Sequence, residues 1–460
     1  MLKLMAGISG ICFILMIHPL SCTAQNESSY GWYTEGEDNR PAERIRFSVT
    51  NQLDISLENQ PVVIIRDQLP VQNISQRSVN IVDPNLPPRS APTVEELETS
   101  GGYLYREETN GRAIYPQLDD LDKDGMWDEL FYLTDLEPGE TRDFYLYIGF
   151  YERGIQPHLV HGAIADYRRH DVPFWESETM GWKLWYPHDV DLHAKIDPVL
   201  TAYYEYSTGN SGYYMPWELG TDIMTVADTF GAGGICLFED PDDPENPSRA
   251  YHSPVKDSGP FHDTRFSFDV VYNGPLRSMI QVNTMNWDSG RGFYELEQRY
   301  TAVAHKSWST VEVNFTRFLP PNDRVQFGAG IRRIGTNESE ETEAVTGNGF
   351  VISMGENIEA RIPDEDIGDE VLVVPWQAIA LVVKEEYEPE YVAIENWGGN
   401  HLFKMPATRD LEYEYMIAGA WSFGEINSTK EEFIRYIEDE ALKYNNPPVV
   451  EIHEYEAKGE

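Results

Sequence analysis

Alternation of apolar and polar residues between residues 266 and 334 constrains the fold more than any other feature of the chain. The stretches FSFDVVYNGPLRSMIQVNTMNW, GFYELEQRYTAVAHKSWSTVEVNFTRFL and RVQFGAGIRRI follow one another with only four residues between them. Apolar residues at every second position lie on one face of an extended chain, which is typical of half-buried β-strands. Similar segments continue to about residue 425, and 35 Gly and 29 Pro supply turns. The sequence therefore predicts a mostly β protein.

One segment near the C-terminus has helical character instead. STKEEFIRYIEDEALKYN, residues 428–445, has apolar side chains at helical spacing and two glutamates in its first turn. Ser428 or Thr429 is expected to cap its N-terminus, and Pro447 and Pro448 end it. We expect one C-terminal helix in an otherwise β fold.

The length of 460 residues is too great for one ordinary domain. Strand-like sequence begins near residue 44, a turn-rich stretch follows at 73–101, and residues 102–150 read as a hairpin-like unit. We predict a β-sandwich-like block over residues 44–150 and a larger β block, carrying the functional site, over residues 151–460.

The N-terminus is expected to direct export. A lysine at position 3, an apolar run over residues 4–17 and small residues up to Ala24 are typical of a secretory signal, which we assign to residues 1–24. Residues 25–43 form a polar leader. A lipid anchor at Cys22 or full secretion are the alternatives to a periplasmic location, and the apolar run is short for a membrane span. The mature chain would keep one cysteine, Cys236, in the apolar run GGICLF, where a buried structural thiol is expected.

Acidic residues dominate the charge of the chain. Against 78 Asp and Glu there are only 35 Lys and Arg, which gives a formal net charge of −43. Such a surface repels nucleic acids and anionic membranes, so neither is an expected partner, and no membrane insertion is expected. An anionic substrate would bind only where Arg, His or a metal ion reverses the local field.

An acidic loop, QLDDLDKDGMWDEL at residues 117–130, has the spacing of a calcium loop. Its candidate ligands are Asp120, Asp122, Asp124, Asp128 and Glu129. The flanking residues read as strands, and the twelfth position of an EF-hand loop would be Phe131 rather than Glu, so a helix-pair calcium sensor is excluded. Two alternatives remain for this hairpin loop: a structural Ca²⁺ site, or a solvated turn in which Asp side chains bind backbone amides.

Four ordered blocks resemble a known family. They are YPQLDDLDKDGMWDELFYLTDLEPGET, RRHDVPFWESETMGWKLWYP, GTDIMTVADTFGAGGICL and YNGPLRSMIQV. Their order resembles the DUF4861 family of exported bacterial proteins associated with polysaccharide utilisation. The resemblance implies a larger part that looks like the galactose-mutarotase supersandwich, and carbohydrate chemistry that includes dehydration of uronate oligosaccharides from ulvan. Where family members carry Tyr-His and a following Asp, this chain has YYMPWELGTD, with Tyr214 and Pro216 at those positions.

Residues 151–235 are irregular and aromatic, and they hold five of the eleven histidines. Elimination beside a uronate carboxylate needs a group that neutralises the carboxylate, a base and an acid. YRRHD offers Arg168, Arg169 and His170 for the carboxylate, with a surface ion-pair cluster as the alternative. Lys183 is a candidate base with a lowered pKa, or else a strand residue that points to solvent.

The tyrosine-rich stretch AYYEYSTGNSGYYMPWELGTD, residues 202–222, is the expected wall of the pocket. Tyr213 and Tyr214 are the acid–base candidates, while Trp175 and Trp217 are candidate platforms for sugar rings, with interior packing as the alternative. Glu176 and Glu218 are candidate substrate-binding residues, and they could instead form a glycosidase carboxylate pair.

Together these observations predict an exported lyase or dehydratase that acts on uronate-containing oligosaccharides by β-elimination. Arg169 and His170 would bind the carboxylate, His170 or a tyrosine would take the proton, and Tyr213 or Tyr214 would supply the acid. A glycoside hydrolase and a non-catalytic glycan-binding protein are the alternatives. No cofactor other than structural Ca²⁺ is expected.

Overall fold

The protein is represented by a computed structural model that describes most of the chain from residue 43 to residue 457. The described residues are 32, 43–71, 74, 79–87, 93–95, 112–114, 116–149, 156–167, 170–186, 189–202, 219–224, 226, 229–250, 264–335, 343–364 and 368–457. At 167, 170, 185–186, 189, 357–364 and 368–373 only the backbone is described. The expected signal peptide and nearly all of the polar leader lie outside these residues.

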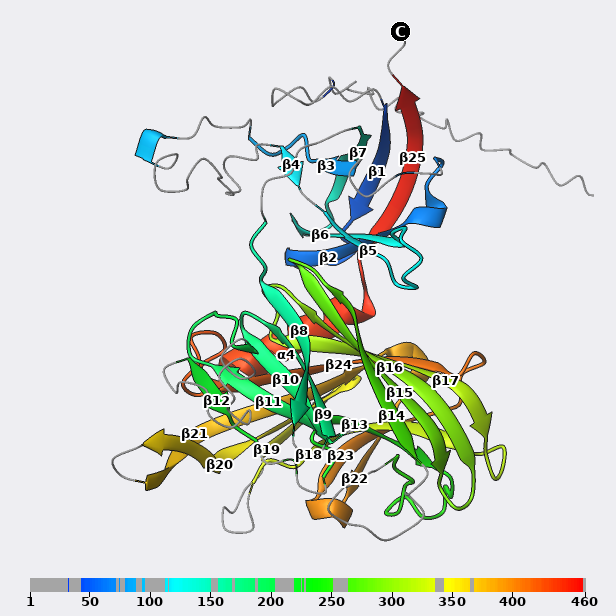
Figure 1. Cartoon of the computed structure of the whole chain (residues 1–460), viewed down its shortest axis with the longest axis vertical. Helices are drawn as coiled ribbons and strands as arrows, with labels where there is room; N and C mark the ends of the chain where they lie inside the picture. Colours follow the sequence, from blue (N-terminus) through cyan, green and yellow to red (C-terminus); the bar gives the residue numbers. More distant parts are fainter. Residues whose placement is uncertain are drawn as a thin grey trace, which may run out of the picture.

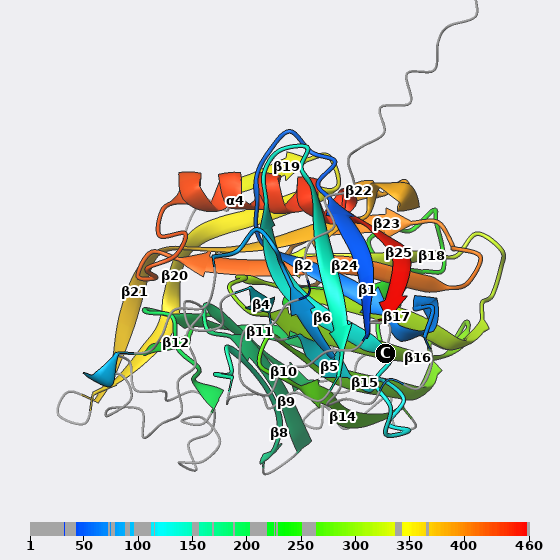
Figure 2. The same ribbon diagram turned by 90° about the horizontal axis from the view of Figure 1, so that it is seen from above.

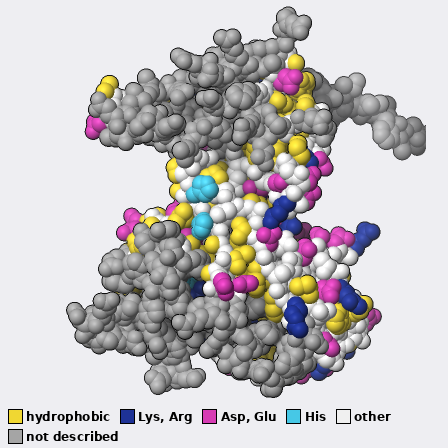
Figure 3. Space-filling view, in the orientation of Figure 1, with side chains coloured by type: hydrophobic (Ala, Val, Ile, Leu, Met, Phe, Trp, Pro, Cys, Tyr) yellow, Lys and Arg dark blue, Asp and Glu magenta, His cyan; other side chains and the backbone are white. Residues whose placement is uncertain are grey.

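The predicted fold class is confirmed. Five antiparallel sheets and one long helix make up the described chain, and they form a smaller part and a larger part (Figure 1). Acidic side chains are visible on both parts in the space-filling view (Figure 3). None of the described helices has the length and hydropathy that crossing a membrane would require.

The smaller part is a sandwich of two sheets around a core that includes Phe47, Trp127 and Tyr132. Phe47 faces inwards because every second residue of a strand points to the same side, as Ile45 and Val49 do on β1. Trp127 comes from the loop before β6. One sheet consists of β25 (Val449–Ala457), β1 (Glu43–Thr50), β7 (Thr141–Ile148), β3 (Val79–Val82) and β4 (Ala113–Ile114), in spatial order. The other consists of β2 (Leu57–Ile65), β6 (Glu129–Leu136) and β5 (Gln117–Asp119).

The C-terminal strand corrects one predicted boundary. β25 was expected in the second block, but it pairs antiparallel with β1, so that Thr50 lies opposite Val449 and Glu43 opposite Ala457 (Figure 1). The side chains of Val450 and Ile452 pack against the sandwich core. The pairing could not be predicted from sequence, because strands at opposite ends of a chain give no local signal that they are in contact.

The larger part contains three sheets around the largest core of the protein. The first is β12 (Gly220–Asp222), β11 (Asp189–Lys195), β10 (Met180–Tyr186), β9 (His170–Ser177) and β8 (Val160–Tyr167). The second is β13 (Ala232–Phe238), β18 (Gln326–Arg332), β23 (Asn400–Met405) and β22 (Glu390–Ile394). The third, with eight strands, is β14 (Arg265–Asn273), β15 (Arg277–Asp288), β16 (Phe293–Val303), β17 (Trp308–Leu319), β24 (Glu412–Trp421), β21 (Gly368–Val383), β20 (Phe350–Asp364) and β19 (Glu343–Gly347).

Short 3₁₀ turns and one α-helix complete the described structure. The 3₁₀ turns are η1 (Arg66–Gln68), η4 (Glu385–Tyr387) and η5 (Asn396–Gly398). The predicted helix is confirmed as α4 (Lys430–Asn445), and it lies along β20 and β21 (Figure 2). Thr429 is its N-cap, in a capping box with Glu432. The predicted burial of Cys236 is confirmed as well, in the middle of β13.

Candidate functional site

The five-stranded sheet of the larger part gathers its buried charged residues on one face. Along β11, Val190, Leu192 and Ala194 point into the main core, so the alternate residues point to the opposite face. This opposite face carries charged and histidine side chains that are almost completely buried: Glu176, Lys183, Asp191, His193 and Lys195. Buried ionisable groups that lie together are costly unless they are paired, which makes this face the first candidate for a functional site.

Lys183 lies at the centre of these groups. Its Nζ is 2.9 Å from Nε2 of His193, 3.0 Å from Oδ2 of Asp222 and 3.4 Å from Oδ2 of Asp191. The four residues come from β10, β11 and β12, and they are called the Lys183 cluster below. Because an ammonium group can only donate, Nε2 of His193 accepts this hydrogen bond, and its proton must be on Nδ1.

Burial controls the ionisation of the Lys183 cluster. It lowers the pKa of His193 to about 3, and the positive charge of Lys183 adds to this effect, so His193 is neutral near pH 7. Burial and the neighbouring Asp222 carboxylate raise the pKa of Asp191 well above its usual range, against the opposing effect of Lys183. The cluster is therefore close to neutral overall when Asp191 holds a proton.

The sheet register brings the polar groups into one row. His161, Glu176, Gly181, His193 and Asp222 are successive cross-strand partners from β8 to β12. The glycine in this row is needed, because a Cβ there would come within 3.0 Å of the Phe174 ring and 3.2 Å of the His193 side chain. Without a side chain at this position, the Phe174 ring packs edge-on against the His193 imidazole, with 5.5 Å between the ring centroids.

A second buried pair, Glu176 and Lys195, lies next to the Lys183 cluster. Oε2 of Glu176 is 2.5 Å from Nζ of Lys195. The same carboxylate accepts hydrogen bonds from the Thr201 amide, the Thr201 hydroxyl and the Ala202 amide, at 2.8 to 3.0 Å. Glu176 therefore fixes the chain that follows β11 to this face of the sheet.

The tyrosine-rich segment starts and ends beside this row. Ala202 is bound to Glu176 at one end, and at the other end the Leu219 carbonyl accepts a hydrogen bond from Ile196 while Gly220 pairs with Lys195. Asp222 follows directly, and its side chain is 12% exposed, the largest exposure in the Lys183 cluster. Asp222 is therefore the member of the cluster that a substrate could reach.

The Lys183 cluster does not fit a metal ion in its present form. One ligand atom each from Asp191, His193 and Asp222 lie within 4.8 Å of one another, which is close enough for a shared cation. However, the ammonium of Lys183 already contacts all three groups and balances their charge. A metal ion at the same place would have to displace or deprotonate Lys183.

Three of the predicted site residues have described side chains on β9 and β10. Trp175 was a candidate sugar platform, but it is fully buried, stacks on Trp182 and donates a hydrogen bond to Ser309, so neither face of its ring is free. Glu176 was a candidate carboxylate for substrate, but its oxygens are occupied as described above. Lys183 was expected to be a base or to point to solvent; instead it is buried within a cluster of partners.

The remaining predicted site residues cannot be compared with the structure. Of His170 only the backbone is described, as the first residue of β9. The others lie outside the described residues: Arg168, Arg169, Tyr213, Tyr214, Trp217 and Glu218. Their roles stay predictions.

The acidic loop joins β5 to β6, as the predicted hairpin requires. Asp120 accepts hydrogen bonds from the amides of Asp124 and Gly125, and Asp124 accepts one from Met126. These are the Asp-to-backbone bonds of a solvated turn. Oxygens of Asp120, Asp122 and Asp124 nevertheless lie within 4.8 Å of one another, as a Ca²⁺ site would need.

Two of the predicted calcium ligands point elsewhere. Glu129 binds the guanidinium of Arg277 at 2.7 Å, and Arg277 also binds Asp119 at 2.7 Å. Asp128 accepts a hydrogen bond from the Leu121 amide at 2.7 Å. Both residues therefore hold the loop in place, and Glu129 ties it to β15 of the larger part.

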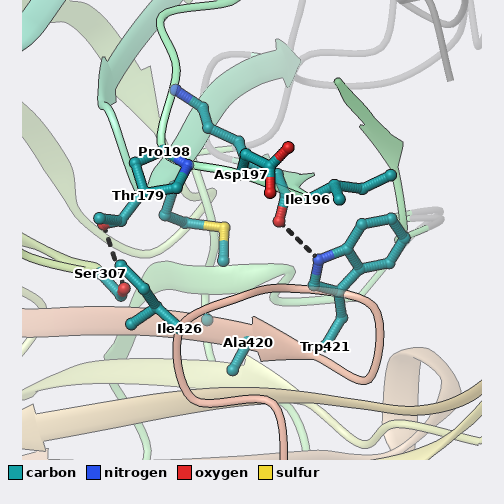
Figure 4. A pocket seen from close by; sticks show the side chains of 11 residues that line it. Thr179, Ile196, Asp197, Pro198, Ser307, Ala420, Trp421 and Ile426 are labelled. Atoms are coloured by element: carbon teal, nitrogen blue, oxygen red, sulfur yellow. Dashed lines mark hydrogen bonds between the residues drawn. The ribbon is translucent and has the colours of Figure 1, made fainter. Parts of the chain in front are cut away.

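A small hollow lies at the end of β10 and β11, near Lys195 (Figure 4). Trp421, whose indole donates a hydrogen bond to the Lys195 carbonyl, forms one wall, and Thr179 and Ser307 are hydrogen-bonded to each other on another. Its volume of about 10 Å³ has room for one water molecule at most. This hollow is too small to bind a sugar.

Sequence reasoning missed four residues of this face: Asp191, His193, Lys195 and Asp222. The first three lie at every second position in VDLHAK, between three apolar residues. Such alternation predicts that they share one face of a strand. Their burial could not be predicted, because it depends on the chain that covers the sheet.

Comparison with known proteins gives one family and several distant structures, among them two from Enterococcus faecalis. No curated protein matches the chain. A protein in the Glycosyl Hydrolase Family 38 from Enterococcus faecalis aligns with a TM-score of 0.42 and 10% identity, over 89% of this chain and 47% of that chain. An alpha-mannosidase from Enterococcus faecalis V583 aligns with a TM-score of 0.40 and 10% identity, over 90% of this chain and 46% of that chain. The chain thus spans about half the length of these two proteins.

The family match covers most of the sequence. The profile of DUF4861, a domain of unknown function, matches residues 49–450. This range includes the Lys183 cluster, the acidic loop and the helix α4. The chain therefore belongs to the DUF4861 family.

Proposed function

We propose that this protein is an exported carbohydrate-active enzyme that acts on uronate-containing oligosaccharides by β-elimination, as a lyase or dehydratase. The observation that carries the proposal is the contact of Lys183 with His193, Asp191 and Asp222 on one buried face. A set of paired ionisable groups with shifted pKa values is what proton-transfer catalysis needs.

The elimination step needs a base near the C5 proton of the sugar and an acid near the leaving oxygen on C4. The bond from C5 to hydrogen and the bond from C4 to oxygen break, and a double bond forms between C4 and C5. In our proposal Asp222 takes the C5 proton, because it is the accessible member of the Lys183 cluster. Tyr213 or Tyr214 protonates the leaving oxygen, and Arg169 and His170 neutralise the substrate carboxylate.

Lys183, Asp191 and His193 act as positioning residues in this scheme. Lys183 holds Asp222 in place through the 3.0 Å contact. Its positive charge also offsets the repulsion between the Asp222 and Asp191 carboxyl groups. Neutral His193 accepts a hydrogen bond from Lys183. This bond orients the Lys183 ammonium group, and His193 adds no positive charge of its own. These three residues therefore hold the Asp222 carboxylate in position without contacting the sugar.

Hydrolysis by a pair of carboxylates is less well supported. A glycosidase needs two carboxyl groups on opposite sides of the glycosidic bond. Glu176 is fully occupied by Lys195, Thr201 and Ala202, and Asp191 and Asp222 bind the same ammonium. Neither arrangement leaves space for a sugar between two acids.

We also propose that the acidic loop binds Ca²⁺ as a structural ion. Oxygens of Asp120, Asp122 and Asp124 lie close enough to share it, and the loop is far along the chain from the Lys183 cluster. The ion would stabilise the β5–β6 hairpin and take no part in the reaction.

Product analysis with oligosaccharides of ulvan tests the proposal. Elimination creates an unsaturated uronate, whose ultraviolet absorbance grows during incubation. Growth of this absorbance supports the proposal. New reducing ends without it would mean hydrolysis, and sugar binding with neither signal would mean a glycan-binding protein; each of these outcomes would overturn elimination.

A further inference from the structure

A large cavity lies between the sandwich and the outer face of the eight-stranded sheet. It has a volume of about 390 Å³ and is lined by residues of both parts, among them Phe131 from β6 and Tyr272, Thr301 and Glu312 from the sheet. A neighbouring hollow of about 380 Å³ shares Glu312 and further residues with it. The volume of the cavity falls within the range of about 300–1,000 Å³ that is typical of small-molecule sites.

A polar row crosses the floor of this cavity. Gln281, Arg299, Glu312 and Glu414 are successive cross-strand partners on β15, β16, β17 and β24. Glu414 is bound to Lys384 at 2.6 Å and to the Tyr444 hydroxyl at 3.0 Å. This row places charged side chains beside the cavity.

Several polar groups that line the cavity have no partner among the described residues. The hydroxyl oxygens of Thr301 and Tyr272 are buried and make no hydrogen bond, although both side chains are more than nine-tenths buried. The exposed Glu312 carboxylate has no hydrogen bond or ion pair within the described structure, and the half-buried Arg299 uses only its Nε, towards Gln281. Buried polar groups are rarely left unpaired in proteins, so the two unpaired hydroxyls of Thr301 and Tyr272 beside one cavity indicate a ligand.

The protonation of Glu312 adds hydrogen-bonding capacity. The surrounding protein, and then the Glu414 carboxylate next to it, raise the pKa of Glu312 to about 7. Near neutral pH the carboxyl group is therefore present in both forms, and it can accept or donate a hydrogen bond. The hydroxyl groups of a ligand can likewise both donate and accept hydrogen bonds, so either form of Glu312 can bind one.

We propose that this cavity binds a neutral saccharide. Among its lining residues four basic and four acidic side chains balance, so the site has no excess charge for an anionic sugar. Met279, Met416 and Trp308 supply an apolar surface for the C–H face of a sugar ring. Thr301, Tyr272, Arg299 and Glu312 supply hydrogen-bonding groups for its hydroxyls.

This saccharide site is separate from the proposed catalytic site. The Lys183 cluster lies on the five-stranded sheet, whereas the residues that line the cavity come from the eight-stranded sheet, α4 and the sandwich. Figure 1 shows the five-stranded and eight-stranded sheets as separate layers. Tests of the two sites are therefore independent. Loss of binding in the cavity leaves the elimination proposal unaffected, and the reverse also holds.

Saturation-transfer NMR on the full chain tests the inference with D-glucose, D-mannose, D-galactose and L-rhamnose, and with D-glucuronate as the charged comparison. We expect at least one neutral sugar to bind, more tightly than D-glucuronate. T301V and E312Q should each weaken that binding at least tenfold without lowering the thermal midpoint by more than a few degrees. T316V, at an exposed position of β17 outside the lining, is the matched control and should bind as the wild type does.

Three results would overturn the inference. They are an absence of binding by all four neutral sugars at millimolar concentration, tighter binding of D-glucuronate, and neutral-sugar binding that T301V and E312Q leave unchanged. In the first case the cavity would hold only water. In the third case the sugar would bind elsewhere on the protein.

Discussion

Nζ of Lys183 lies 2.9 Å from Nε2 of His193, and both side chains are buried, at 1% and 0% exposure. A lysine that donates to a buried histidine keeps that histidine neutral, because a second positive charge so close would be repelled. His193 therefore belongs to the ionic cluster without carrying charge. This relationship makes the stability of the protein depend on pH in a defined way.

Acid should destabilise the protein through His193. The pKa of His193 is about 3 in the folded protein, against an ordinary value of 6.5, so the unfolded chain binds one more proton between these values. The contribution of His193 is fully present above pH 6.5 and is lost as the pH falls towards 3. Between these two pH values, the free energy of unfolding falls through His193 by up to about 1.4 kcal/mol for each pH unit.

The variant H193Q tests this dependence. The free energy of unfolding is measured with urea between pH 6.5 and 4. Its slope against pH reports the number of protons taken up on unfolding, which should be smaller in the variant than in the wild type by up to one proton. Equal slopes in both proteins would show that His193 is protonated in the folded state, and the assigned hydrogen bond from Lys183 would be wrong.

Replacing Lys183 by Met should strongly destabilise the fold. Asp222 and Asp191 would lose their shared cation, and breaking a buried ion pair costs about 3–5 kcal/mol. We expect a smaller loss at pH 5 than at pH 8, because protonation of the carboxyl groups relieves the unpaired charge. K384M is the matched control: the Lys384–Glu414 pair is partly exposed, so its loss should cost about 1 kcal/mol or less.

Glu176 should matter for stability rather than for substrate binding. In E176Q the Lys195 ammonium loses its anion, and one of the hydrogen bonds from Thr201 and Ala202 becomes unfavourable. We expect a loss of about 3 kcal/mol in urea unfolding. E395Q, which removes the exposed partner of Arg333, should cost less than about 1 kcal/mol. Equal losses in the two variants would contradict the assigned role of Glu176.

Much of the fold could be predicted from local patterns. Strand alternation gave the β class, and Thr429 with Glu432 marked the start of α4, because both signals lie within a few residues of the chain. The pairing of β25 with β1 could not be predicted. It joins residues about 400 positions apart, and nothing in either strand specifies the other.

Sequence reasoning selected the segment that holds Lys183 but not the residues that the structure places around it. This segment was expected to carry function, because it is aromatic and rich in histidine. For Trp175 a sugar platform and interior packing were both open, and the structure shows interior packing, with the ring stacked on Trp182. Which face of a strand is buried depends on the layers packed on each side, and a single strand pattern does not contain this information.

Calcium should stabilise the β5–β6 hairpin. If Asp120, Asp122 and Asp124 bind Ca²⁺ only in the folded state, ligand at a hundred times its dissociation constant adds about 2.7 kcal/mol to the stability. We expect millimolar Ca²⁺ to raise the thermal midpoint, and EDTA to reverse the rise. D122N should abolish the effect, since Asp122 is one of the three candidate ligands. An equal midpoint with Ca²⁺ and with EDTA would show that the loop is only a solvated turn.

The initial rate of unsaturated-uronate formation by D222N, compared with D166N, tests the central claim most directly. Asp166 lies on β8 of the same sheet and is exposed. D166N therefore makes the same chemical change on the same sheet, but outside the Lys183 cluster. We predict that D222N, assayed at a temperature where it is folded, loses at least about a hundredfold in kcat, the usual contribution of a general base. Its thermal midpoint should fall as well, because the buried Lys183 ammonium loses one of its anions. D166N should keep the wild-type rate. A folded D222N protein with the full wild-type rate would contradict the account.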